Sequence, residues 1–105
     1  MIKKKQYDIV IGFKDQNVKK EIITPYEVIK IIEPFLCKNT IHFSIIQTHG
    51  AYSYSNTELV FERSIILRLI DCNPKIVKMM AKSLKMYLNQ EKVDVSDKEI
   101  EVEYI

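Results

Sequence analysis

Side chains able to do acid–base or anion-binding chemistry gather in residues 49–63, HGAYSYSNTELVFER. His49 and Glu62 could donate or accept a proton, and Arg63 could bind an anion. These residue types in one short stretch predict a shallow pocket for a small ligand or a reacting substrate. No specific catalytic motif accompanies them, so His49 and Glu62 are candidate catalytic groups and not an assigned pair.

Two tyrosines lie in the same stretch. Tyr52 and Tyr54 could stack on a ligand or hydrogen-bond to it, so we expect them to bind the ligand together with Arg63. The same composition is also typical of a hairpin end whose polar side chains face solvent and whose glutamate and arginine form one internal pair. The residues leave both interpretations open, and the solvated hairpin end is the more common of the two.

Metal, phosphate and nucleophilic chemistry have little support in the sequence. His42 and His49 are seven residues apart, so on a strand they point to opposite faces and cannot share a metal ion within one chain. No GxSxG, Walker or GxGxxG motif is present. We therefore expect no metal and no cofactor. Asp8 with Glu62 could hold metal ions for phosphoryl transfer, which is a less favoured alternative.

Hydrophobic periodicity predicts the elements that must position these side chains. Alternating apolar residues predict strands, apolar stripes at helical spacing predict helices, and the pairs Thr24–Pro25 and Asn73–Pro74 are typical helix starts. The expected order is strand 7–13, helix 24 to about 36, strands 40–50 and 58–71, helix 73–88, an extended piece at 92–95, a turn at 96–98 and strand 99–105.

This order of elements predicts one ferredoxin-like α+β domain over residues 1–105, with an antiparallel sheet and two helices on one face. The other face would stay open. Strand parity assigns to it the apolar residues Val10, Ile46, Val60, Ile66 and Ile70. Because a bare apolar sheet of that extent is typical of an interface, we expect a homo-oligomer, a symmetric dimer formed through the sheet.

Parity also makes predictions for the reactive stretch. Glu62 is expected on the open face and Arg63 on the helix-covered face, where an inward guanidinium needs a carboxylate or helix carbonyls as partner. A bulge of one residue would exchange the two faces. Gly12, inside the first strand, predicts a bulge there.

The composition of the chain indicates which kinds of partner and which cellular compartment to expect. The formal charge is only +2, and no apolar stretch approaches the ~20 residues that span a bilayer, so we expect no membrane partner. Cys37 and Cys72 form no CxxC pair, which favours a reducing cytoplasm. The lysines of helix 73–88 could touch phosphates, but strand 58–66 has Phe61 as its one aromatic residue and lacks a base-stacking platform. This disfavours nucleic acid.

Four short segments resemble a family of small bacterial and phage-borne proteins known only as a domain of unknown function. They are IGF at 11–13, GAY at 50–52, ERSII at 62–66 and LNQEKV at 88–93. The resemblance spans most of the chain, from Asp8 to Ile105, and implies ferredoxin-like α+β structure without a settled activity. It draws attention to the matching positions Gly50, Tyr52, Glu62 and Gln90, and it adds Gln90 to the expected ligand-binding residues.

The sequence therefore favours a non-catalytic binding or regulatory module. It would act through protein–protein contact or capture a small ligand near the 49–63 hairpin, for example as a trap that mobile elements use against nucleotide-signalling defence. Two alternatives stay open. One is a small enzyme in which His49 and Glu62 do acid–base chemistry beside Arg63, and the other is a nucleic-acid-binding domain.

Overall fold

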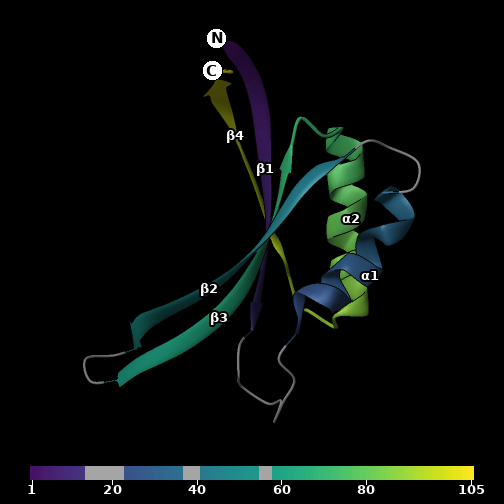
Figure 1. Cartoon of the computed structure of the whole chain (residues 1–105). Coiled ribbons are helices and arrows are strands. Elements are labelled where there is room, and N and C mark those ends of the chain that lie inside the picture. The colour runs from purple at the N-terminus through teal and green to yellow at the C-terminus, as the bar shows by residue number, and fades with distance from the viewer. Residues whose placement is uncertain (14–22, 37–40, 55–57) are drawn as a thin grey trace.

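A computed structural model of the chain describes residues 1–13, 23–36, 41–54 and 58–105. Its elements alternate between strands and helices (Figure 1). They are β1 (Ile2–Phe13), α1 (Pro25–Leu36), β2 (His42–Tyr54), β3 (Glu58–Ile70), α2 (Pro74–Tyr87) and β4 (Asp94–Val102). The βαββαβ order predicted from the sequence is confirmed.

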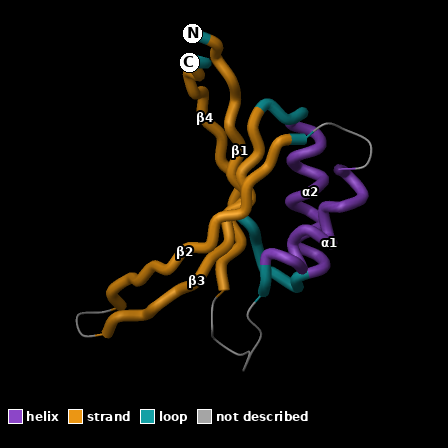
Figure 2. Tube along the Cα trace, in the orientation of Figure 1, coloured by secondary structure: helices purple, strands orange, loops and turns teal. Residues whose placement is uncertain are grey.

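The four strands form one antiparallel sheet in the order β2-β3-β1-β4. Both helices lie on the same side of this sheet, and no described element covers the opposite side, which we call the open face (Figure 2). Because the two central strands, β3 and β1, are not adjacent in the chain, the fold interleaves its two βαβ-like halves. The architecture is the predicted ferredoxin-like α+β fold.

The core lies between the central strands and the helices. Alternate residues of β1 and β3 point toward the helices. Each helix packs against them with a stripe of apolar residues at helical spacing. The side chains with at most 1% exposure are Ile9, Ile11, Val28, Ile32, Ile65, Leu67, Leu69, Val77, Met80 and Leu84. Each buried aliphatic side chain of this size contributes roughly 1.5–3 kcal/mol by leaving water, so this layer holds the sheet and helices together.

Local signals start both helices where the sequence predicts. In α1, the Thr24 amide donates to Glu27 Oε1 at 3.1 Å and the Glu27 amide donates to Thr24 Oγ1 at 3.3 Å, which completes a capping box. In α2, the Asn73 side chain accepts from the Lys75 amide at 2.8 Å and Pro74 takes the first helical position.

The edge strand β4 differs from the prediction. Residues 96–98 were expected to turn, yet β4 runs without interruption and its register with β1 is continuous from Val10↔Asp94 to Ile2↔Val102. Residues 2–6, which precede the predicted strand 7–13, are likewise paired with β4. Opposite charges accompany this pairing, because Lys5 Nζ lies 3.1 Å from Asp97 and Lys3 Nζ lies 3.7 Å from Glu99. Backbone pairing along β1 outweighs the turn propensity of the Ser-Asp-Lys segment.

Strands β2 and β3 continue past the rest of the sheet and project away from the helices (Figure 1). They pair from His42↔Ile70 to Tyr54↔Glu58, whereas β1 pairs with β3 only as far as Phe13↔Arg63. Residues 50–54 and 58–62 therefore form a two-stranded ribbon, which we call the arm. A two-stranded ribbon without a third strand or a helix to pack on is marginally stable in water.

The continuous registers overturn two expectations. Gly12 makes no bulge, since β1 and β3 pair without a break through Gly12↔Ser64. Arg63 is not inward beneath the helices; its side chain is exposed, and it forms no ion pair with a described residue. Arg63 has the parity of buried Ile65, but the helices do not extend over the strand at this point.

Among the described residues, the helices are all too short or too polar to cross a membrane.

A pair of leucines on one strand tests the core. Leu67→Ala, at a fully buried position of β3, is expected to lower the free energy of unfolding by about 2–5 kcal/mol, because it leaves a cavity between sheet and helices. Urea denaturation followed by circular dichroism measures this. Leu59→Ala on the arm is the matched control, since Leu59 is 66% exposed; an equal loss in both variants would contradict the burial pattern.

Candidate functional site

On the open face of the sheet, residues that are paired across neighbouring strands form three rows, one apolar and two polar. One row is apolar: Ile46, Ile66 and Val10 lie directly opposite one another on β2, β3 and β1 and are half-buried by their neighbours alone. The sequence predicted these three on the open face, and the register confirms it. The side chain of Val60, predicted beside them, lies outside the described residues.

An ion pair occupies the next row. Arg68 of β3 donates from Nε to Asp8 Oδ1 at 3.0 Å and from Nη2 to Asp8 Oδ2 at 3.1 Å. The side chains are only 35% and 18% exposed, although no helix covers them. This bidentate hydrogen bonding raises the pKa of Arg68. Both carboxylate oxygens of Asp8 are thereby engaged, so the arrangement does not favour Asp8 as a metal ligand.

A pair of hydroxyl groups lies on the other side of the apolar row. Thr48 and Ser64 face each other across β2 and β3, and their hydroxyls are hydrogen-bonded; the Thr48 hydroxyl also reaches the Ser64 carbonyl oxygen at 3.4 Å. Gly12 continues this row on β1. A Cβ at Gly12 or at Gly50 would meet no atom within 4 Å, so the sheet has unfilled space above the backbone where the arm begins.

The predicted reactive residues are distributed over the arm and its base. His49 and Arg63 are register partners on neighbouring strands, and both are exposed. Glu62 pairs with Gly50. Because strand side chains alternate, His49 and Arg63 share the sheet side of Ile65, opposite to Thr48 and Ser64.

Other predicted ligand-binding residues are placed only by their backbone. Tyr52 pairs with Val60 and Tyr54 pairs with Glu58 along the arm. The side chains of Tyr52, Tyr54 and Glu62 lie outside the described residues, so their participation stays a prediction.

Gln90 lies in a different part of the molecule, just after α2. Its amide donates to the Lys85 carbonyl oxygen at 2.9 Å and its side chain donates to the Leu88 carbonyl oxygen at 3.4 Å. These bonds close the C-terminal end of α2. Since the arm projects away from both helices (Figure 1), a single chain brings His49 and Arg63 together and leaves Gln90 apart.

Sequence reasoning did not identify the Asp8–Arg68 pair or the Thr48–Ser64 pair. Arg68 and Ser64 have the parity of Ile66, which the sequence assigned to the open face, but their partners depend on the register of three strands. The available signal was charge complementarity: one acid on the first strand and one base on the third, both at outward positions. Across the described ranges, no group of three or more His, Cys, Asp or Glu side chains is placed to hold a metal ion.

Comparison with known proteins gives a fold and no family. No protein-family model matches the chain, and no curated protein sequence matches it either.

Solved structures do match it. The structure of a phage SAM lyase in complex with S-methyl-5'-thioadenosine has a TM-score of 0.66 at 20% identity and covers 91% of this chain and 81% of that one. A phage SAM lyase in the apo state has a TM-score of 0.64 at 24% identity, covering 90% and 79%. CutA from Synechococcus elongatus PCC7942 has a TM-score of 0.55 at 7% identity, covering 91% and 75%. At these identities the likeness establishes the fold alone.

Two conservative substitutions test the open-face ion pair. Asp8→Asn leaves Arg68, which is mostly covered, without its carboxylate, so we expect a clearly lower urea midpoint. Asp97→Asn is the matched control, because its Lys5 pair is 50% exposed on each side and an exposed pair contributes little. Equal midpoints for the two variants would contradict the assigned importance of the Asp8–Arg68 contact.

Proposed function

We propose that this chain binds S-adenosylmethionine and cleaves it, acting as an S-adenosylmethionine lyase. The observation that carries the proposal is the fold likeness to phage SAM lyase over nine tenths of the chain, seen both with and without S-methyl-5'-thioadenosine. Its TM-scores, 0.66 and 0.64, exceed the 0.55 of CutA from Synechococcus elongatus. The small-ligand capture predicted near the 49–63 hairpin becomes, in this proposal, capture of an adenosine-containing sulfonium compound.

The chemistry suits a chain without an assigned acid–base pair. Forming S-methyl-5'-thioadenosine breaks the bond between the sulfonium sulfur and the γ-carbon of the methionine part, and the electron pair stays on sulfur. If the substrate's own carboxylate attacks that carbon, the second product is a lactone and no water or external base is consumed. Sulfonium and carboxylate charges disappear together, so surroundings that exclude water accelerate the step.

The protein's contribution would then be orientation and exclusion of water. Arg63 is suited to hold the substrate carboxylate, because guanidinium forms paired hydrogen bonds with it and can aim one oxygen at the reacting carbon. Because Tyr52 and Tyr54 have the strand parity of Thr48 and not that of His49, they are proposed to stack on the adenine of a substrate whose carboxylate is bound by Arg63 of a second copy. His49 and Glu62 remain candidates for proton transfer if the second product arises instead by elimination, which requires a base.

A second copy of the chain is part of the proposal. Within the described chain, the arm has no third strand and the half-buried row of Ile46, Ile66 and Val10 has no covering element. Association through the open face would shield both. The Asp8–Arg68 pair supports this, since two charges that neutralise each other are less costly to cover than two separate ones.

Turnover is the direct test of the lyase proposal. Purified protein incubated with S-adenosylmethionine should produce S-methyl-5'-thioadenosine and a lactone in equal amounts, detected by liquid chromatography with mass spectrometry. S-adenosylhomocysteine is the matched control ligand, because it lacks the sulfonium charge and should remain intact. Binding without turnover would leave the non-catalytic ligand-binding module, the class favoured from sequence; neither binding nor turnover would overturn both.

Arg63→Gln tests the site. We expect kcat/KM to fall about tenfold or more, because one charge-assisted contact to the carboxylate is lost. Lys75→Gln removes the same charge from an exposed position at the start of α2 and should leave kcat/KM unchanged. Equal effects of the two substitutions would assign Arg63 to general electrostatics and not to the site.

Ile66→Lys tests association through the open face. Native mass spectrometry should show the wild-type chain as an oligomer and the variant shifted toward the monomer, because a lysine at the centre of the covered surface loses its hydration. Met86→Lys, at a 66% exposed position of α2, is the control and should not shift the species. Circular dichroism verifies that both variants fold. A monomeric wild-type chain would refute the association.

A further inference from the structure

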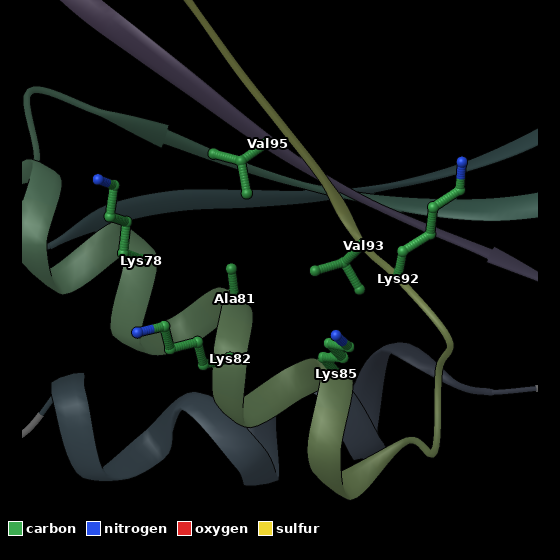
Figure 3. A pocket seen from close by; sticks show the side chains of 7 residues that line it. All are labelled: Lys78, Ala81, Lys82, Lys85, Lys92, Val93 and Val95. Atoms are coloured by element: carbon green, nitrogen blue, oxygen red, sulfur yellow. The ribbon is translucent and has the colours of Figure 1, made fainter.

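A groove lies between α2 and the edge strand β4, on the helix-bearing side of the molecule (Figure 3). It has a volume of about 230 Å³. Its floor is apolar: Val93 and Val95 point from the β4 segment toward Ala81 on α2 (Figure 3). Val95 is 45% exposed, although it lies beside the core. The rim consists of lysines, namely Lys78, Lys82, Lys85 and Lys92.

The lysines of this rim have no ion-pair partner among the described residues. Helix α2 contains four lysines and no acidic residue. The side chains of the four rim lysines are exposed and form no ion pair or hydrogen bond with any part of the chain that the structure describes. Lysines at the other end of the β1–β4 pair differ, since Lys3 and Lys5 lie against Glu99 and Asp97. The groove is therefore a concentrated basic surface on a protein with a net charge of only +2.

The strand beside the groove can accept another strand. β4 is at the edge of the sheet and pairs with β1 alone, so its outer backbone groups have no strand partner among the described residues. A segment that pairs with such an edge directs alternate side chains to one side of the sheet. Here that side is the apolar floor, with the lysine rim next to it.

We propose that the groove between α2 and β4 binds an extended acidic peptide segment of a partner protein. The segment pairs with the free edge of β4, inserts aliphatic side chains over Ala81, Val93 and Val95, and directs carboxylates to the four rim lysines. Charge complementarity and the exposed edge both specify this occupant.

A nucleic acid would also be attracted by the lysines, but it matches the lining of the groove less well than a peptide does. Binding of single strands relies on aromatic side chains that stack with bases, and the lining of this groove consists of lysine, alanine and valine. An aliphatic floor offers neither a stacking surface nor hydrogen bonds to base edges. The floor is instead matched to aliphatic side chains, which a peptide supplies.

Fluorescence anisotropy with defined probes tests the proposal. The fluorescein-labelled peptide has serine at every second position, and valine and glutamate by turns between the serines, so a strand presents valine and glutamate on the same side. It should bind the wild-type protein, and raising NaCl from about 50 mM to about 500 mM should weaken it, because exposed charge pairs are screened. Replacing every glutamate by glutamine, or every valine by serine, should weaken binding, since each peptide then lacks one of the two features. N-methylation of alternate residues removes the donors for strand pairing and should also weaken binding.

Substitutions inside and outside the groove test whether the peptide binds there. The double variant K82E/K85E should weaken the glutamate–valine peptide about tenfold or more, because two attractive contacts become repulsive. Lys75→Glu, on the same helix and outside the groove, is the matched control and should change affinity less than about twofold. Val95→Thr should also weaken binding, because it puts a hydroxyl on the floor while keeping a β-branched side chain.

Three results would overturn the proposal. They are no binding of the glutamate–valine peptide, an oligothymidylate that competes as strongly as the peptide, and a change of oligomeric state in K82E/K85E, which would make a second copy the occupant. S-adenosylmethionine turnover by K82E/K85E should equal that of the wild-type chain. Failure of the peptide test and failure of the lyase proposal are therefore separately visible.

Discussion

The structure depends on one-sided burial of two central strands. β1 and β3 place Ile9, Ile11, Ile65 and Leu67 against the helices with at most 1% exposure. Both helices are used on that side, so nothing in the described chain covers the other. This single constraint determines the register, because a shift of one residue would move the buried side chains to the open face. It also means that the side chains of β1 and β3 that point away from the helices lie on a surface that is only partly shielded from water.

On the open face, the polar side chains form hydrogen bonds and an ion pair with one another. Asp8 and Arg68 neutralise each other, Thr48 and Ser64 share a hydrogen bond, and the apolar row lies between these two pairs. A surface of this kind can be covered by another protein surface at modest cost, since few of its polar groups lose water without a partner. The basic groove at β4 has the opposite character, because its lysine side chains form no ion pair within the described chain.

The proposed sites lie in different parts of the sheet, which separates the two proposed activities. The open face and the arm are assigned to assembly and to the sulfonium ligand, and the α2–β4 groove is assigned to an acidic segment. A small fold can hold both sites because one face of its sheet is free and one edge of its sheet is free, and these are different places.

Much of this protein followed from local patterns. Alternation, helical spacing and the two caps determined the element order and the sheet face of Val10, Ile46 and Ile66, because these signals act over a few residues. Tertiary structure decided what depends on contacts between distant segments. It made 94–102 one strand through pairing with β1, and it exposed Arg63 because the helices do not cover the arm. It also joined Asp8 to Arg68 and placed Val95 beside the lysines of α2.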